Sequence, residues 1–363
     1  MSKKRICFVF NHFQYQDGVC RSAIALANLL AERDDVDVDF LIIYKYDSSV
    51  LDLLSNKVKV NVICGCYFRG LDKLFKLIPR SILYNKYLKE KYDVEIAFQS
   101  GTSYEIITSV LKQPNVLRIG WVHGYDDSKH MKPMYLAMDR LVCVSKINAS
   151  RLFQHLDAKK QVDYCYNPIN EDIVCKQGKD KISITRNRDV CQFVSVGRLS
   201  PEKGYKRLIK ILARLKKNGY VFSFWLIGDG PDRESLDKLI KGNNLQDFVQ
   251  LLGPQKNPHK YTVKADLFIC SSYSEGYSTV CAEAIILGIP VLTTPVSGAE
   301  EIISEANSGV ITGMDDMSIY KSLEYILKNR YLINNWKDTI ELTKEKFYSK
   351  ERFKRFLRII DLR

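Results

Sequence analysis

Two glutamates eight residues apart, Glu275 and Glu283, occupy very different sequence environments. Glu275 lies in a polar segment that contains Gly276, whereas Glu283 lies within an almost wholly apolar run at 280–287. That run predicts a buried helix from about 278 to 288, because a helix that is apolar on all sides is normally buried. A buried carboxylate needs a polar or charged partner. Glu283 therefore either pairs with a buried Lys or Arg, or accepts hydrogen bonds from the hydroxyls of a polyol ligand.

The beginning of this predicted helix suits an anion. Ser278 or Thr279 would lie at its N-terminus. Unpaired backbone N–H groups and the helix dipole at that end attract phosphate groups. One loop–helix junction could thus hold a diphosphate by its backbone, one sugar by Glu275 and another by Glu283.

A second stretch, "SVGRLSPEKGYKRLIKIL" at 195–212, predicts a strand that ends at Gly197 and a helix that starts after Gly204. Arg198 and Lys203 flank the turn between them, and two cations at this place suit a phosphate. An ordinary turn with solvated charges is the alternative. In "LIGDGPDRESLDKLI", 226–240, the third glycine of a dinucleotide fingerprint is absent and Pro231 would start a helix, so no NAD site is expected.

These motifs need a scaffold, and the chain alternates strand-like and helical patterns throughout. Strand-like runs occur at 5–10, 38–44, 58–63, 94–100, 116–123, 140–145 and 162–168, and again at 191–197, 221–228, 248–253, 266–270 and 290–294. The alternation predicts two doubly wound α/β domains with parallel sheets. We expect domains at 1–170 and 191–345, a polar linker at 171–190 and a last helix within 346–363. Ligands should bind beyond the carboxyl ends of the strands, in the cleft between the domains.

Bulk properties narrow the class of protein. The net charge of +13 suits nucleic acid, an anionic membrane, anionic substrates or merely a basic solvated surface. No nucleic-acid recognition motif is present, so a nucleic-acid partner is not expected. The chain has no apolar run long enough for a membrane span and no signal peptide, so we expect it in the cytoplasm. The ten scattered cysteines are expected to be reduced, and no metal site is expected.

With these motifs in place, a family resemblance becomes specific. "EGYSTVCAEA" resembles the E-x7-E signature of retaining glycosyltransferases of family 4, and "GRLSPEKG" resembles their phosphate-binding turn. "LLGPQKNPHKYTVKADLFICSSYSEGY" supplies the elements expected between them, so the resemblance covers 191–312. It implies the GT-B fold: two Rossmann-like doubly wound domains that face each other across a cleft. The C-terminal helix usually crosses back to the N-terminal domain.

The resemblance implies roles for individual residues of the second half. Arg198 and Lys203 would contact the donor diphosphate, Glu283 the ribose hydroxyls and Glu275 the hydroxyls of the transferred sugar. The other implied contacts come mainly from backbone groups, and they are at Gln255 for the base and at Gly276, Tyr277, Ser278, Thr279 and Val280 for phosphate and sugar.

The first half matches the family less sharply. Gly18 stands where a glycine lets backbone approach the donor phosphate, although Asp17 precedes it where the family often has a second glycine. In "GWVHGYDD", His123 would face the transferred sugar, although a lone histidine is more often structural.

The resemblance implies a retaining, metal-independent hexosyltransferase that uses a nucleotide sugar, expected to be a UDP-sugar, as substrate and needs no cofactor. The diphosphate would leave from the face that the acceptor attacks and would help to deprotonate the acceptor. A nucleotide-sugar epimerase or phosphorylase of the same fold is the alternative. The expected acceptor is a saccharide, hypothesised to be lipid-linked, in cell-surface polysaccharide, lipopolysaccharide or glycolipid synthesis.

Residues 69–91, "RGLDKLFKLIPRSILYNKYLKEK", intersperse Lys and Arg with Leu, Phe, Ile and Tyr. A basic amphipathic helix of this kind can lie on an anionic membrane, and Pro79 would break it into two pieces. We hypothesise a peripheral contact with the inner face of the plasma membrane. A packed helix with a solvated basic face is the alternative.

Overall fold

The computed structural model describes residues 3–14, 18–66, 68, 70–71, 75, 77–124, 130–158, 160–184, 186–187 and 189–362. The chain divides into two compact units. Unit 1 comprises Met1–Pro168 and Ser349–Arg363, and unit 2 comprises Ile169–Tyr348.

Unit 1 is built on a parallel sheet in the order β3-β2-β1-β4-β5-β6-β7. Its strands are β1 (Lys4–Phe10), β2 (Val36–Ile42), β3 (Lys59–Val62), β4 (Val94–Ala97), β5 (Leu117–Val122), β6 (Arg140–Cys143) and β7 (Gln161–Tyr164). The central strand β1 ends in five buried residues, as expected for a parallel sheet that is covered on both faces.

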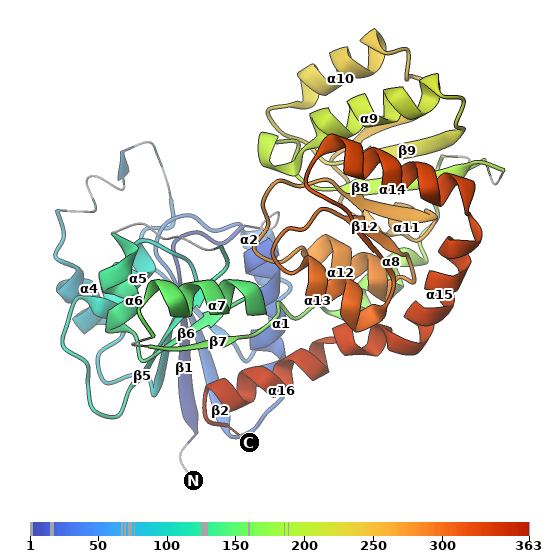
Figure 1. Cartoon of the computed structure of the whole chain (residues 1–363). Coiled ribbons are helices and arrows are strands. Elements are labelled where there is room, and N and C mark those ends of the chain that lie inside the picture. The colour runs from blue at the N-terminus through green and yellow to red at the C-terminus, as the bar shows by residue number, and fades with distance from the viewer. Residues whose placement is uncertain are drawn as a thin grey trace. The chain divides into compact units, whose positions relative to one another are not determined.

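Helices cover both faces of this sheet (Figure 1). They are α1 (Gly18–Ala31), α2 (Ser48–Leu51), α4 (Arg80–Tyr87), α5 (Thr102–Thr108), α6 (Met131–Ala137), α7 (Lys146–His155) and α16 (Ser349–Ile359). One core joins the sheet to α4–α7 through residues such as Tyr84, Tyr104 and Leu152. On the other face α1 contacts α16.

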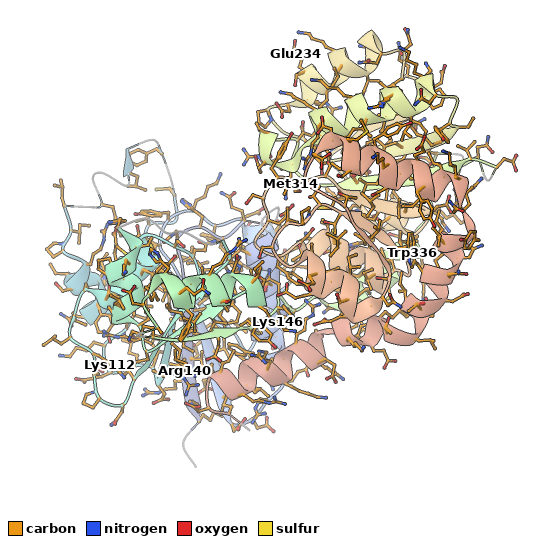
Figure 2. All side chains as sticks on the ribbon, viewed as in Figure 1. Lys112, Arg140, Lys146, Glu234, Met314 and Trp336 are labelled. Atoms are coloured by element: carbon orange, nitrogen blue, oxygen red, sulfur yellow. The ribbon has the colours of Figure 1, made fainter. Side chains whose placement is uncertain are left out.

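The last helix, α16, packs against the first half of the chain. The ring of Phe356 lies 6.2 Å from Phe8 of β1 and 5.7 Å from Trp121 of β5. Arg140 of β6 donates to the carbonyl of Ile359 and pairs with Asp361, and Figure 2 shows its position beside this end of the chain. A buried apolar face thus attaches the C-terminal segment to unit 1.

Unit 2 has a parallel sheet in the order β10-β9-β8-β11-β12-β13. Its strands are β8 (Cys191–Val196), β9 (Phe222–Ile227), β10 (Val249–Gly253), β11 (Leu267–Cys270), β12 (Val291–Thr293) and β13 (Gly309–Ile311). The strand β13 was not predicted. It is three residues long, and too short a run to show the alternation by which strands are recognised.

The helices of unit 2 are α8 (Glu171–Gly178), η1 (Pro201–Lys203), α9 (Tyr205–Lys217), α10 (Arg233–Gly242), α11 (His259–Thr262), α12 (Thr279–Ile286), α13 (Ala299–Ala306), α14 (Asp316–Lys328), α15 (Tyr331–Thr343) and η2 (Lys344–Phe347). One core joins the sheet to α9, α10 and α14. The helices α8, α11 and α12 contact one another.

The helix α8 lies in the segment expected to be a linker. Asn170 accepts a hydrogen bond from the backbone of Ile173 and so caps the helix, and Val174 is buried. Polar composition concealed this short helix, because one buried apolar residue in eight leaves almost no periodic signal.

Both sheets reverse their strand order beside the first strand, between β1 and β4 in unit 1 and between β8 and β11 in unit 2. Ligands of such sheets bind beyond the carboxyl ends of the strands at this switch point. The loops after β8 and β11 are the two motif-bearing stretches of the second half.

No disulfide joins any of the ten cysteines, all of which lie in the described part of the chain. Among the described helices, none combines the length and the apolar character needed to cross a bilayer.

Candidate functional site

The loops after β8 and β11 are bonded to each other at the switch point of unit 2. The amide of Tyr273 donates to the carbonyl of Glu202 at 2.7 Å, and the Ser271 hydroxyl donates to the carbonyl of Lys203 at 3.0 Å. Gly204, with φ of 67°, permits this approach, because a Cβ there would collide with the carbonyl oxygen of Ser271. The two motifs therefore form a single structure.

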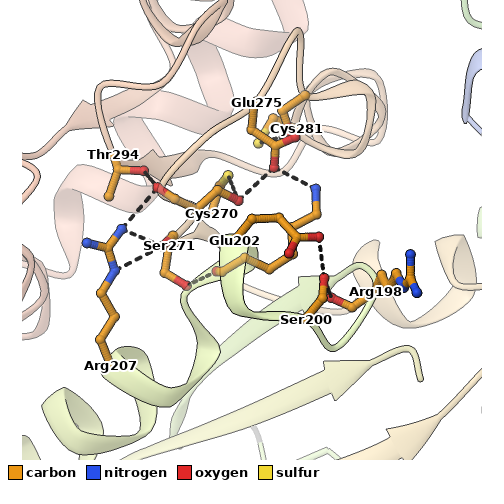
Figure 3. Close-up of polar contacts among 12 residues, drawn as sticks. Arg198, Ser200, Glu202, Arg207, Cys270, Ser271, Glu275, Cys281 and Thr294 are labelled. Carbon is orange, nitrogen blue, oxygen red and sulfur yellow. Dashed lines mark hydrogen bonds and ion pairs between the residues drawn. The ribbon is translucent and has the colours of Figure 1, made fainter. Parts of the chain in front are cut away.

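Lys203 and Glu275 meet across this junction (Figure 3). Nζ of Lys203 lies 2.7 Å from Oε1 of Glu275, and the Ser272 hydroxyl donates to the same oxygen at 2.6 Å. Burial disfavours the charged ammonium, but the Glu275 carboxylate outweighs this effect and raises the pKa of Lys203. Lys203 is therefore a cation throughout the neutral range, held beside the end of β11.

Arg207 on α9 supports the loop that carries Glu275 from behind. Its guanidinium donates to the carbonyls of Ser271 (Nε, 3.0 Å), Ser272 (Nη2, 3.0 Å) and Met314 (Nη1, 2.7 Å). Only 4% of Arg207 is exposed, and the guanidinium lies 3.7 Å from the centre of the Tyr273 ring. These carbonyl groups are neutral, so Arg207 adds a buried positive charge behind the loop.

Arg198 is the exposed cation of the site. It follows β8 and lies at the surface, and its guanidinium makes no hydrogen bond or ion pair with the described residues. The next turn is fixed without it, since Ser200 donates to Glu202. Arg198 is therefore available to an anionic ligand without breaking an existing contact.

The helix α12 begins at Thr279 without a side-chain cap. Ser278 occupies the N-cap, but its hydroxyl contacts Sγ of Cys281 at 3.1 Å and accepts no capping bond. The first turn of an α-helix presents backbone N–H groups that have no intrahelical partner. This end of α12 therefore keeps its attraction for an anion.

Glu283 faces a histidine, a partner that the sequence interpretation did not consider. Its Oε2 lies 3.3 Å from Nε2 of His259, the first residue of α11. Glu283 is 8% exposed and His259 is 4% exposed, so the carboxylate and the imidazole meet inside unit 2.

The thiols of Cys270 and Cys281 lie close enough to Glu275 for its charge to act on both (Figure 3). The hydrogen bond from Cys281 lowers the pKa of Cys270 to about 6, whereas burial raises the pKa of Cys281. Cys270 also contacts the Ser272 hydroxyl at 3.5 Å. The apolar run at 280–287 thus contributes a polarisable thiol, that of Cys281, in addition to the Glu283 carboxylate.

The G-D-G-P turn packs against the loop after β8. A Cβ on Gly228 would collide with the carbonyl of Gly197, and one on Gly230 would meet the backbone of Leu199. These glycines let the loop after β9 approach the loop after β8. Gln255, after β10, donates to the carbonyl of Leu252 at 2.9 Å, which fixes the backbone expected beside the base.

In unit 1, the described residues at the switch point include a neutral cluster around Gln99. The Gln99 side chain accepts from the amides of Asn11 (2.9 Å) and His12 (3.1 Å), which joins the loops after β4 and β1. Gly18 is the first residue of α1. His123 follows β5 with its ring 4.8 Å from Phe98, and burial lowers the pKa of His123 to about 3. His123 therefore offers an uncharged imidazole.

The structure brings together Arg198, Lys203, Glu275 and the start of α12 in unit 2, and it places His123 and Gly18 in unit 1. The sequence interpretation missed Arg207, Ser272 and His259. Arg207 could have been found as a charge in an apolar helical stripe, because Leu208, Ile211 and Leu215 share its buried face.

Within the described residues, no cluster of three His, Cys, Asp or Glu side chains could hold a metal ion. Asp126 and Asp127, two carboxylates adjacent in sequence, lie outside the described residues.

Comparison with known proteins bears on this arrangement. Residues 177–343 match the model of the family described as glycosyl transferases group 1. This match covers most of unit 2 and agrees with the coarser expectation of a glycosyltransferase.

A curated relative supports it as well. The chain is 29% identical over 225 residues to the N-acetylgalactosamine-N,N'-diacetylbacillosaminyl-diphospho-undecaprenol 4-alpha-N-acetylgalactosaminyltransferase of Campylobacter jejuni. The matched segment covers 61% of this chain and 60% of the relative, which is less than two thirds of the relative's length.

Solved structures share the fold over nearly the full length. The lipopolysaccharide outer core galactosyltransferase WaaB aligns with a TM-score of 0.77 and 20% identity, over 98% of this chain and 99% of that chain. HepE of Anabaena in complex with UDP and glucose aligns with a TM-score of 0.77 and 15% identity, over 99% of each chain. The GT-B fold with two Rossmann-like units, as expected from the sequence, is confirmed.

Proposed function

We propose that this protein is a glycosyltransferase that transfers a sugar from a nucleotide sugar, expected to be a UDP-sugar, to a saccharide acceptor. The observation that carries the proposal is the junction of the loops after β8 and β11. It joins the Lys203–Glu275 pair, the exposed Arg198 and the uncapped start of α12 at the switch point of unit 2. Relatives named as transferases support this reaction over the epimerase or phosphorylase alternative.

In this proposal the diphosphate of the donor lies against Arg198, Lys203 and the first amides of α12. These groups stabilise the negative charge that develops as the diphosphate leaves, and we propose that no metal is required. Gln255 frames the base, Glu283 accepts from the ribose hydroxyls, and Glu275 with Gly276 and Tyr277 positions the transferred sugar.

We also propose retention of configuration. The bond from the anomeric carbon to the diphosphate oxygen breaks, and the acceptor oxygen bonds to the same face of that carbon. The acceptor proton passes to the departing diphosphate, so no enzymic nucleophile is needed. His123, kept neutral by burial, would hydrogen-bond the sugar and would not act as an acid.

The ribose assignment has a direct test. Replacing Glu283 by Ala should weaken UDP binding about tenfold, a loss of about 1.4 kcal/mol, in calorimetric titration. The matched control is Glu300→Ala, because Glu300 is an exposed glutamate of unit 2 on α13. Equal UDP affinity in Glu283→Ala and the wild type would show that Glu283 does not hold the ribose.

Glu275 is proposed to act on the transferred sugar and not on the ribose, so its replacement should change turnover more than UDP affinity. Glu275→Gln should leave UDP affinity within about twofold and should lower the rate of UDP release from the UDP-sugar by about a hundredfold, or 2.7 kcal/mol. Screening a panel of UDP-sugars for thermal stabilisation identifies the donor for this assay. The same assay in EDTA tests metal independence, since unchanged turnover is expected.

A lipid-linked acceptor and a contact with anionic membrane are further parts of the proposal. On and before α4, Leu77 is 76% exposed and Ile82 is 56% exposed, beside the exposed Lys86 and Lys89. Arg80 does not join this surface, because its Nε lies 2.8 Å from Glu105. Part of 69–91, including Lys73 and Lys76, lies outside the described residues.

This membrane contact can be tested by flotation with vesicles. The protein should float with phosphatidylglycerol-containing vesicles and much less with phosphatidylcholine alone. The double variant Leu77→Ser and Ile82→Ser should lose most of this recovery. Leu111→Ser is the control, because Leu111 is 95% exposed elsewhere in unit 1. Equal recovery with both vesicles would contradict an electrostatic contact.

A further inference from the structure

Three side chains from three helices of unit 2 form a continuous contact. Gln177 of α8 contacts His259 of α11, with 2.7 Å between Oε1 and Nδ1, and Nε2 of His259 lies 3.3 Å from Oε2 of Glu283 on α12. His259 is 4% exposed and Glu283 is 8% exposed. The imidazole thus separates an amide from a carboxylate inside the protein.

The backbone around this contact fixes the position of His259. Pro258 precedes it at the N-cap of α11, and Asn257 donates to the carbonyl of Gln177 at 2.9 Å. Asn257 also donates to the carboxylate of Asp180 at 2.8 Å. Asn257, two residues before His259, is therefore bonded to the segment that contains Gln177. These bonds fix α11 to α8 on the side of the ring opposite Glu283.

A buried carboxylate is tolerated when a donor or a cation faces it. Nε2 of His259 occupies that place for Glu283 at 3.3 Å, and the contact is favourable when Nε2 carries a hydrogen. Two states meet this condition: a protonated ring whose Nδ1 donates to Oε1 of Gln177, or a neutral ring whose Nδ1 accepts from the amide group of a flipped Gln177 side chain. Gln177 at Nδ1 fixes the plane of the ring and keeps Nε2 directed at the carboxylate. This is the arrangement by which an outer partner orients a histidine in many functional sites.

We propose that His259, oriented by Gln177, is a positioning residue that holds the Glu283 carboxylate in the direction needed to accept hydrogen bonds from the ribose hydroxyls of the donor. This inference rests on the proposed function and extends it to a residue outside the motifs. A carboxylate that is free to rotate pays conformational entropy when it binds a diol, whereas one that is already oriented does not. His259 should therefore favour ribonucleotides over their deoxy analogues.

The experiment compares UDP with 2′-deoxy-UDP in calorimetric titrations of the full-length protein. The wild type should bind UDP about tenfold more tightly than 2′-deoxy-UDP, about 1.4 kcal/mol. His259→Phe should lose most of this preference, with UDP weakened and 2′-deoxy-UDP nearly unchanged. His259→Gln keeps an amide donor near the position of Nε2 and should restore part of it. Lys264→Ala, an exposed change just after α11, is the control.

A merely structural role for His259 would weaken both nucleotides equally, because general loosening does not distinguish the 2′-hydroxyl. Equal preference in His259→Phe and the wild type would overturn the inference while leaving the proposed function intact. Absence of UDP binding by the wild type would instead overturn the proposed function, and this inference with it. Gln177→Leu, which removes only the outer partner, gives the same comparison if His259→Phe does not fold, and it should show a smaller loss of preference.

Discussion

The two units bury ionic groups in different places. In unit 1, Glu95 and Arg118 are paired across β4 and β5, each at the second residue of its strand, with Oε2 and Nε 3.4 Å apart. Tyr84 donates to Glu95 at 2.8 Å. These groups lie near the amino ends of the strands. At the carboxyl ends, the described residues include the neutral Gln99 and His123 after β4 and β5. A buried cation, Arg352 of α16, donates to the carbonyl of Asn167 beyond β7.

In unit 2 the buried charges gather at the carboxyl ends. Lys203 pairs with Glu275, Arg207 holds the loop after β11, and His259 faces Glu283. Each of these contacts fixes a loop or a helix end where a ligand of the sheet would bind. Under the proposed function, the buried pair of unit 1 serves the fold, whereas those of unit 2 serve a ligand at a stability cost.

The largest effect is expected in unit 1 and on stability alone. Arg118→Met leaves the buried Glu95 without its cation and should lower the free energy of unfolding by about 3–5 kcal/mol in denaturant titration. UDP affinity at a temperature where the variant is folded should stay within about twofold. A loss of UDP affinity as large as that in Glu283→Ala would break the distinction between the two units.

This loss should depend on pH. Burial raises the pKa of Glu95 to about 7, so the folded state binds more protons than the unfolded state between pH 4.5 and 7. Stability from this group therefore falls as pH rises through that window. The Arg118→Met variant should be more strongly destabilised at pH 8 than at pH 5, and Glu95→Gln should remove the dependence.

Arg207 of unit 2 tests whether a buried charge there affects activity and not only stability. Arg207→Met leaves buried carbonyls without a donor and should lower kcat/KM for the donor by about a hundredfold, or 2.7 kcal/mol. Arg207→Lys keeps the charge but not the planar fork and should fall between Met and wild type. If both variants lose stability but keep full kcat/KM, Arg207 belongs with the structural charges.

Arg198 should show the opposite pattern, because it is exposed. Arg198→Ala is expected to weaken UDP about tenfold while changing the free energy of unfolding by less than about 0.5 kcal/mol. Lys210→Ala, an exposed change on α9, is the control. Unchanged affinity in Arg198→Ala would remove this cation from the proposed diphosphate site.

The last effect concerns His123 and is negligible at neutral pH. Burial lowers its pKa to about 3, so the unfolded state binds more protons as pH falls below about 6.5. Stability should drop by at most about 1.4 kcal/mol for each pH unit in this window. His123→Gln should flatten the dependence between pH 6 and 4 in denaturant titrations. An equal slope in both proteins would mean that His123 is not buried in the neutral form.

The sequence predicted the fold class well because local signals carry it. The strands of both sheets are apolar runs, and the two motifs lie where a strand meets a helix. The segments that it missed, α8 and β13, are short and carry few apolar residues in periodic order. Their formation depends on tertiary contacts that no local pattern records.

The site was predicted in part for a similar reason. Spacing identified Glu275 and Glu283 but not the residues that contact them, most of which come from other segments. Ser272 is close in sequence and inconspicuous, Lys203 was noted only for phosphate, and His259 lies on a separate helix. A lone histidine in a sequence does not show what it faces, so the contact with Glu283 required the fold.

The central claim is that the junction of the loops after β8 and β11 binds a nucleoside diphosphate. A crystal structure of the protein with UDP tests it most directly. We predict the diphosphate beside Arg198, Lys203 and the first amides of α12, with the ribose hydroxyls on Glu283. UDP bound elsewhere, or a ribose that does not touch Glu283, would contradict the account.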